Sequence, residues 1–569
     1  MKLLQILFIL FLYLLPNTVF SQITWTIQER KDSNSIYKII YQKNSKDSLA
    51  YQNWLKQYLA SKTENGYIEL QTTQTKKSEK QNFTVFITLG TRNTWLQIGK
   101  GNLPTKQERW KNKPFSLQTI TQYQQKILHY AETIGHPFAQ IRLDSLQVQA
   151  GKWQAIWAYQ PRLYVTFDSV AVVGKVKTNA RFLRQYLRLQ IGQPYNHTKI
   201  EAIKTRLQRL PYLRLDQPPE VRFMQDKAIV LLTLSNPKAN QIDGILGVLP
   251  NENRRGQLLL TGELNGQFYN LFAQGHSFKI QWQRLQTQSQ RLEMETNFQT
   301  IFNTPLQFQA GFKLLKQDST FVNQQWELRL GYATQGSSDF FAQILHQKTN
   351  LGNAINLYEN KQLPNISETK WQGYGFGYKV QTLDDVFFPK TGIQLHFSVY
   401  TGVKQIIRNP FLPDTLYKDL ALNTPQTLTR IEAQGYFSVG KGVFKLGVQG
   451  AYLANKQLFT NELMRVGGLT SLRGHNQNAF FASQYLITTV EYRLPLDVGS
   501  YVFVFYDQAY LESRILRDFT ADSPAGIGFG ANLSLKAGVF SLAYALGKDK
   551  TNGFSFSRSK IHFGVVSRF

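Results

Sequence analysis

Apolar and polar residues alternate along the chain from residue 241 to residue 569, and this alternation constrains the fold more than any other feature. Successive side chains of a β-strand point to opposite faces, so the pattern predicts strands with one apolar and one polar face. No apolar run of eighteen or more residues follows the N-terminus, which excludes a helical transporter or channel. The clearest examples are Phe278–Trp282, Leu306–Leu314, Ile393–Val399 and Phe444–Val448.

Two architectures fit this pattern. A soluble sandwich would bury the apolar face in its core, whereas a membrane barrel would turn that face to lipid and its polar face to a lumen. The apolar face is rich in Phe, Tyr and Trp, as in interfacial girdles, and the run is too long for one ordinary sandwich. We therefore predict a transmembrane antiparallel β-barrel over residues 238–569, with about 16 strands at about 20 residues per strand and connection.

The preceding residues show helical periods instead. Apolar residues recur at helical spacing in four stretches, and strand-like runs follow the breakers at Asn65-Gly66, Gly135-His136-Pro137 and Pro211-Tyr212. The pattern predicts a β-α-α-β-β unit that recurs about three times, as a tandem array of small α+β modules. The helical stretches are Trp54–Leu59, Leu117–Ile134, Phe182–Leu187 and Ile200–Leu210. The predicted modules span residues 22–91, 92–161 and 162–237.

Residues 1–21 have the pattern of a secretory signal peptide. Lys2 precedes the apolar stretch Leu3–Leu15, and a small-residue cleavage site ends at Ser21. The alternative is a single anchoring helix, against which the short apolar stretch and Pro16 argue. The net charge of +28 in an exported chain points to anionic lipid head groups or acidic client segments rather than nucleic acid, although a solvated surface with a basic bias explains it equally well.

These modules and this barrel resemble the BamA/TamA outer-membrane assembly-factor superfamily, whose soluble modules are called POTRA domains. The third module carries the clearest POTRA-like residues, and the barrel contains a loop similar to the family's signature loop. Three modules before a barrel are most similar to the TamA-like layout. The matching segments are Val173-Gly174, Thr178, Gly192–Asn196, Pro219–Phe223, Asp385, Pro389–Gly392, Gly467–His475, Val490–Arg493 and Phe503–Asp507.

The resemblance implies that the signature loop folds into the lumen, where Arg473 docks on inward-facing acids. Alternation supplies Glu491 and Asp507 as those acids, and a guanidinium offers a planar fork suited to carboxylates. The alternative is an arginine on a solvated, glycine-rich outer loop. Two residues depart from the family pattern: His475 stands where an aromatic residue is usual, and Ala509 where glycine is usual. The other loop residues singled out are Gly467, Gly468 and Gly474.

The last strand ends on the aromatic residue Phe569, which shares its face with Phe563. This ending resembles the recognition signal of bacterial outer-membrane proteins, although any last strand also needs outward apolar residues. The strand must close against the first one, near Gln241–Val248, which contains Gly244 and Gly247. Glycine weakens strands, so this seam is a candidate lateral opening; a packing role for the glycines is the alternative.

Nothing in the sequence favours an enzyme. There are no cysteines, the eight histidines are scattered, and no nucleotide-binding or nucleophile-elbow motif occurs. We therefore expect no cofactor and no metal, and interpret Glu293 and Glu295 as lumen lining.

Three functions remain open. The first is an outer-membrane factor that captures unfolded β-strand clients through periplasmic modules and inserts or passes them at the seam, in contact with membrane lipid and with accessory proteins. The second is a two-partner-type secretion pore for one exoprotein. The third is a passive porin or receptor.

Overall fold

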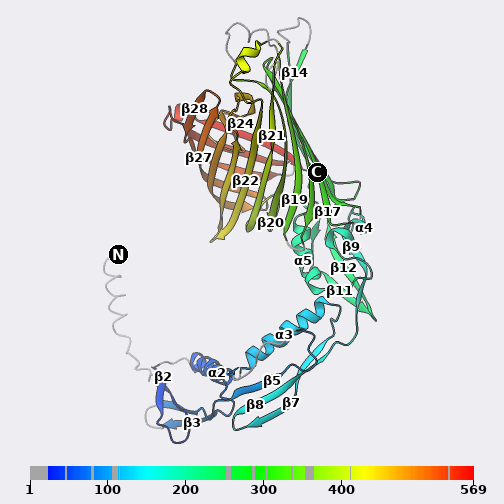
Figure 1. The fold of residues 1–569 in the computed structure, drawn as a ribbon. Helices are drawn as coiled ribbons and strands as arrows, with labels where there is room; N and C mark the ends of the chain where they lie inside the picture. The colour runs from blue at the N-terminus through cyan, green and yellow to red at the C-terminus, as the bar shows by residue number, and fades with distance from the viewer. Residues whose placement is uncertain are drawn as a thin grey trace, which may run out of the picture. The chain divides into compact units, whose positions relative to one another are not determined.

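The computed structural model describes residues 24–44, 48–77, 82–105, 113–114, 116–250, 258–284, 289–302, 304–334, 337–352, 364–410, 412–535 and 538–568 (Figure 1). The chain divides into two compact units. One comprises Met1–Val165 with Pro194–His197, and the other comprises Thr166–Gln193 with Thr198–Phe569. The predicted signal peptide and the terminal Phe569 lie outside the described residues.

The first unit contains two small modules of the same design. In each, a four-stranded sheet has two parallel inner strands and is accompanied by one helix, with sheet orders β2-β1-β4-β3 and β6-β5-β8-β7. The sequence predicted two helices per module, but the described residues show one in each, and a strand (β2 or β6) pairs beside the first strand instead. The elements are β1 Thr24–Arg30, β2 Lys38–Asn44, α2 Ser48–Glu64, β3 Gln71–Lys77, β4 Asn82–Thr88, β5 Thr94–Gly99, β6 Lys113–Pro114, α3 Leu117–Thr133, β7 Gln140–Gln149 and β8 Lys152–Gln160.

Helix α3 shows how the sequence builds these modules. The Ser116 side chain caps its N-terminus by accepting a hydrogen bond from the Thr119 amide. Its apolar residues return every three or four positions, so that Ile120, Tyr123 and Ile127 are all buried against the sheet. The helical spacing read from the sequence therefore marks the face that forms this module's core.

The third module is the one with two helices, and it belongs to the same compact unit as the barrel. Strand β12 pairs in parallel with β9 and antiparallel with β11, which leaves one side of β9 and of β11 unpaired among the described residues. The alternate residues Ala228, Val230 and Leu232 of β12 are fully buried. The elements are β9 Thr166–Val173, α4 Ala180–Leu187, α5 His197–Gln208, β10 Arg214–Leu215, β11 Glu220–Met224 and β12 Lys227–Ser235.

From Gln241 the chain forms a closed antiparallel barrel of 16 strands, in which the two short segments β28 and β29 together occupy one strand position. Strands β28 and β29 both pair with β27 and follow one another along one edge of it. The strands are β13 Gln241–Pro250, β14 Leu258–Leu271, β15 His276–Arg284, β16 Gln290–Ile301, β17 Leu306–Gln317, β18 Phe321–Ala333, β19 Ser338–Leu351, β20 Glu368–Gln381, β21 Gly392–Ile407, β22 Asn423–Val439, β23 Gly442–Ala454, β26 Gln484–Asp497, β27 Ser500–Ile515, β28 Asp518–Asp522, β29 Ala525–Leu535, β30 Gly538–Lys548 and β31 Lys560–Arg568.

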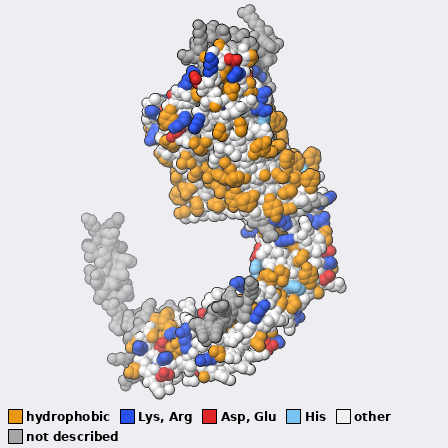
Figure 2. All heavy atoms as spheres, viewed as in Figure 1, with side chains coloured by type: hydrophobic (Ala, Val, Ile, Leu, Met, Phe, Trp, Pro, Cys, Tyr) orange, Lys and Arg blue, Asp and Glu red, His pale blue; other side chains and the backbone are white. Residues whose placement is uncertain are grey.

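The barrel turns its apolar face outward. Along β18, for example, Trp326, Leu328 and Leu330 are exposed while the alternate residue Glu327 is buried on the inner side. Figure 2 shows apolar side chains gathered in a belt across the face of the barrel in view, with Lys and Arg side chains beyond it at the end away from the third module. This arrangement confirms the predicted membrane barrel and excludes the sandwich, whose apolar faces would be covered. None of the described helices has the length and apolarity needed to cross a membrane.

The third module is joined to the barrel by polar contacts at the barrel's near end. Asn270 donates its side-chain amide to the Lys177 carbonyl at 2.6 Å, and the Asn179 amide donates to the Ala273 carbonyl at 2.9 Å. Arg209 at the end of α5 forms an ion pair with Asp339 of β19, and both side chains are largely buried. This pair ties the module to the barrel wall beside the lumen.

Replacing Arg209 by alanine should loosen this joint, because it leaves the buried Asp339 carboxylate without its partner. Losing one member of a buried ion pair costs about 3–5 kcal/mol, which corresponds to roughly a hundredfold or more in local opening. We expect hydrogen exchange of the α5 amides to accelerate accordingly in Arg209→Ala, and to be slower again in Arg209→Ala/Asp339→Ala. Unchanged exchange in the single variant would show that the pair does not hold the module.

Candidate functional site

The connection between β23 and β26, residues 455–483, folds into the barrel and crosses its lumen. It contains the short elements η3 (Thr460–Glu462), β24 (Met464–Val466) and β25 (Phe480–Ala482). Asn461 exchanges two hydrogen bonds with the Ser367 backbone, at 3.1 and 3.0 Å, and Glu462 forms a buried ion pair with Lys404 of β21 at 2.5 Å. These contacts hold one end of the connection against the wall formed by β20 and β21.

The other end of the connection carries Arg473, whose guanidinium lies inside the barrel between two carboxylates. Its Nε and Nη2 donate to the two oxygens of Asp507, each at 2.7 Å, and Nη1 donates to Glu491 Oε2 at 2.5 Å. The Arg473 backbone amide also donates to Asp507 at 3.2 Å. Arg473 is 8% exposed, Glu491 3% and Asp507 0%, so the charges compensate one another away from bulk water.

Three further side chains belong to this network, and the sequence analysis gave none of them a role. The Phe505 ring lies under the Arg473 guanidinium, with its centroid at 3.5 Å. Thr489 donates to Asp507 Oδ1 at 2.9 Å, and Arg493 donates to Glu491 Oε1 at 2.7 Å. Each lies two residues from Asp507 or Glu491 on the same strand face, so the strand period alone could have placed them there.

Glycines let the loop reach the barrel wall. Gly467, Gly468 and Gly474 all have positive φ, at +124°, +97° and +88°. On the wall, a Cβ atom at Gly526 of β29 would lie 1.9 Å from the Arg473 carbonyl oxygen, and one at Gly547 of β30 would lie 2.4 Å from the Gly474 carbonyl oxygen. The barrel wall therefore has no side chains at the two positions where the loop backbone contacts it. Glycine alternates along β29 at Gly526, Gly528 and Gly530, but only Gly526 meets the loop, whereas Cβ atoms at Gly528 and Gly530 would meet the rings of Phe505 and Phe503.

His475 packs in the position where the resemblance led us to expect an aromatic residue. Its ring meets Phe480 edge to face at 5.0 Å, and Nε2 lies 3.2 Å from the Ala525 carbonyl oxygen, to which it must donate. The side chain is 8% exposed, and burial lowers the pKa of this imidazole below its ordinary value of 6.5. The neutral ring therefore suits this site.

The loop also touches the last strand. The Gly474 amide lies 3.4 Å from Nε2 of His562 on β31. Together with Gly526 and Gly547, this contact brings the loop against β29, β30 and β31, the three strands that lead to the closure of the barrel. The signature loop and the seam are thus adjacent parts of one site.

The seam itself is short. Strands β13 and β31 pair at two positions among the described residues, Gln241 with Arg568 and Ile242 with Ser567, whereas β13 and β14 pair at ten. Gly244 fits the packing alternative, since a Cβ there would lie 2.5 Å from the Glu263 carbonyl oxygen of β14. Gly247 pairs with Thr261 of β14, and Phe563 is 61% exposed on the lipid-facing side. The weakness of the seam therefore lies in missing pairing, while Phe569 falls outside the described residues.

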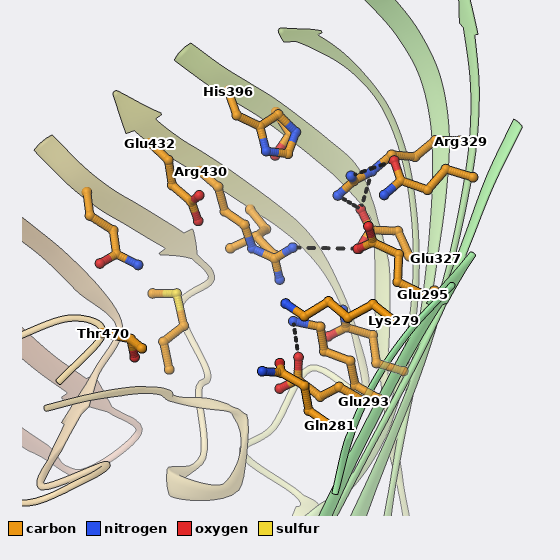
Figure 3. A pocket seen from close by; sticks show the side chains of 18 of the residues that line it. Lys279, Gln281, Glu293, Glu295, Glu327, Arg329, His396, Arg430, Glu432 and Thr470 are labelled. Carbon is orange, nitrogen blue, oxygen red and sulfur yellow. Dashed lines mark hydrogen bonds and ion pairs between the residues drawn. The ribbon is translucent and has the colours of Figure 1, made fainter. Parts of the chain in front are cut away.

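The rest of the lumen holds a polar cavity of about 710 Å³ (Figure 3). Glu293 pairs with Lys313 at 3.3 Å, and Glu327 pairs with Arg329 and lies 4.0 Å from Arg430. Glu295 also lines the cavity, in line with the lumen-lining interpretation of these acids. Within the described ranges, no group of three or more His, Asp or Glu side chains could hold a metal ion.

Comparisons with known proteins address the fold and one module. Residues 165–235 match the POTRA family, described as surface antigen variable number repeat. CdiB from Escherichia coli is 13% identical, with a TM-score of 0.54 over 91% of this chain and 98% of that one. CdiB from Acinetobacter baumannii is 11% identical, with a TM-score of 0.54; the match covers 84% of this chain and 90% of the CdiB chain. BamA from Haemophilus ducreyi lacking POTRA domains 1–3 is 14% identical, with a TM-score of 0.42; the match covers 83% of this chain and 100% of the BamA chain. No curated protein matches the chain.

Residues 165–235 are therefore a POTRA domain, and the chain shares the fold of the CdiB structures. The predicted fold class, with a POTRA domain before a C-terminal transmembrane barrel, is confirmed. A closed barrel with an outward apolar belt belongs in an outer membrane.

Arg473→Ala should release the loop from the wall, because it leaves the buried Asp507 without its main partner. The expected penalty is about 3–5 kcal/mol, since the pair is buried. The barrel should still insert, but hydrogen exchange in residues 467–479 should rise strongly. Arg473→Lys should restore only part of the protection, because an ammonium cannot reproduce the planar fork.

The matched control is Arg514→Ala, which removes an exposed arginine stacked on Phe519 at 5.0 Å, outside this network. Equal exchange in Arg473→Ala and Arg514→Ala would show that the Arg473 contacts do not hold the loop.

The loop should also loosen in acid. Because the pKa of His475 is lower in the folded loop than its ordinary 6.5, its neutral form stabilises the loop above pH 6.5 and this contribution is lost as the pH falls below 6.5. Asp522, Asp549 and Lys560 also act on this ring. Hydrogen exchange of residues 467–479, corrected for its intrinsic pH dependence, should accelerate below pH 6.5 in the native protein and not in His475→Phe. Persistence of the effect in that variant would assign it to another group.

Proposed function

We propose that this outer-membrane barrel with its POTRA modules is an assembly or translocation factor for unfolded β-strand polypeptides. Such clients need hydrogen-bond partners before they enter lipid, because the bilayer core provides none. The observation that supports the proposal best is the seam, where two paired positions close a barrel whose other strands are paired along most of their length. A client strand that pairs with the free stretch of β13 or β31 would satisfy its amides as it enters the membrane.

The modules supply the capture step in this proposal. An extended client adds to an exposed sheet edge by β-augmentation, in which the main chain provides most of the hydrogen bonds. Within the described residues, β7 of the second module and β11 of the third each pair on one side only. We place these modules in the periplasm, where clients arrive unfolded, and assign the chain no enzymatic step, cofactor or nucleic-acid partner.

The signature loop has a supporting role in this mechanism. Arg473, Glu491 and Asp507 fix the loop to the wall, and Gly474 reaches His562 on the last strand. We propose that this docking keeps β29 to β31 in place while the seam opens. The loop then determines which wall of the barrel stays rigid.

A second candidate function is a two-partner-type secretion pore for one exoprotein. The polar cavity in the lumen favours it, because an extended polar segment could occupy such a space. The connection 455–483 crosses the lumen, however, so secretion through the lumen requires that the connection leave its contacts at Lys404 and Asp507. A passive porin accounts for neither the modules nor the crossed lumen.

A disulfide across the seam tests lateral opening directly. Ile242 and Ser567 are register partners, and the chain has no cysteine of its own, so Ile242→Cys/Ser567→Cys joins the two strands at one defined point. We expect the oxidised protein to lose client assembly and to regain it after reduction. The single cysteine variants under the same oxidant are the controls. Full activity of a quantitatively cross-linked barrel would contradict lateral opening.

Depletion separates the candidate functions. Broad loss of outer-membrane proteins after depletion supports assembly, and loss of one exoprotein supports secretion. Altered solute permeability with both protein pools intact would contradict the proposal and indicate a porin.

A further inference from the structure

Two lysines face one another on the lipid-facing side of the barrel. Lys348 of β19 and Lys370 of β20 are direct register partners. Their face is the outer one, because Ile344 and Tyr374 on the same alternate positions are 40% and 55% exposed, while Gln347 on the other face lines the lumen. Directly opposed side chains on antiparallel strands have Cβ atoms about 5 Å apart, so the two ammonium groups share one small region of the surface.

The direct cross-strand neighbours of the pair on this face are uncharged, and one carboxylate, that of Glu368, lies beside the pair. Gln324 of β18 stands opposite Lys348, and Gln405 of β21 stands opposite Lys370. Glu368, two residues from Lys370 along β20, accepts the Leu351 amide on its Oε1 at 3.2 Å, and its single negative charge leaves the two lysines with a net positive charge. Neither lysine forms an ion pair within the part of the chain that the structure describes. Like charges placed directly opposite one another destabilise a sheet, so an anion bound between the two lysines would reduce their electrostatic repulsion.

The pair also lies at the border of the apolar belt. The next residue of β19 on the same face, toward the belt, is His346. Its register partners are Gln372 on β20 and Trp326 on β18. Trp326 is 52% exposed, and Trp is characteristic of the level where hydrocarbon meets head groups. Lys316 of β17, opposite Val322, adds a third lysine on this face. The lysines therefore lie at head-group level, at the end of the barrel away from the third module, where Figure 2 shows Lys and Arg side chains beyond the belt.

We propose that Lys348 and Lys370 form a binding site for the phosphate group of a membrane lipid. Phosphate is the anion found at this depth, and lysine binds it as a point charge through three donors. The acyl chains of the same lipid would lie along the apolar residues below, among them Ile344 and Phe376, which is 61% exposed. Strands β19 and β20 are about half-way round the barrel from the seam of β13 and β31. A lipid held there anchors the wall opposite the seam.

The test measures lipid binding by the full-length protein in detergent micelles, with native mass spectrometry as the readout and diphosphoryl lipid A as the probe. Lys348→Gln/Lys370→Gln should bind this probe about 25-fold more weakly, at about fivefold per lysine. The control, Lys418→Gln/Lys550→Gln, loses the same charge from two exposed lysines outside the strands and should bind like the native protein. Lys348→Arg/Lys370→Arg should retain binding.

Two further probes identify the ligand chemistry. The native protein should bind dephosphorylated lipid A weakly, and millimolar inorganic phosphate should not displace diphosphoryl lipid A, because the acyl chains contribute to binding. Equal binding of both lipids, displacement by inorganic phosphate, or native-like binding by the double glutamine variant would each overturn the proposal. Heat-modifiable migration in gels reports folding of every variant, and the single substitutions Lys348→Gln and Lys370→Gln replace the double variant if it does not fold.

Discussion

A backbone amide inside a bilayer has no water to bond to, and the rest of this structure depends on that constraint. It explains why the alternating half of the chain closes into a ring of 16 strands rather than an open sheet. The same constraint applies to the seam. At β13 and β31 the ring closes through two described pairs, so most residues on this side of β13 have no strand partner within the described part of the chain.

The proposed opening of the barrel at the seam requires that the neighbouring strands keep their places. The loop carrying Arg473 meets this need with buried charges rather than apolar packing. Asp507 and Glu491 are almost fully buried, and each would be costly without its partners, so the docked loop is strongly favoured over a detached one. Because Gly526 and Gly547 have no side chains, the loop backbone lies directly against β29 and β30, next to the strand that forms the seam.

The wall formed by β18 to β20, on the other side of the barrel from the seam, interacts with three different surroundings. At its near end, Arg209 and Asp339 join it to the POTRA domain. On its inner face, paired charges such as Glu327 with Arg329 keep the lumen polar without leaving isolated ions. On its outer face, the unpaired lysines at positions 348 and 370 point to lipid phosphate. Each set of charges is matched to the medium that it faces.

The sequence by itself determined the features that depend on local period. Alternation indicated the barrel, its outward apolar face and the inward direction of Glu491 and Asp507, because side-chain direction in a strand repeats every two residues. Helical spacing found the helices of the modules, although it predicted a second helix in the first two modules that the described residues do not contain. Only the tertiary structure decided which distant segments meet. Examples are the contact of Gly474 with Gly547, the stacking of Phe505 on Arg473, the pairing of Lys348 with Lys370, and the closure of the barrel by two paired positions. These contacts depend on the register between strands and on loop closure, and no local pattern encodes either one.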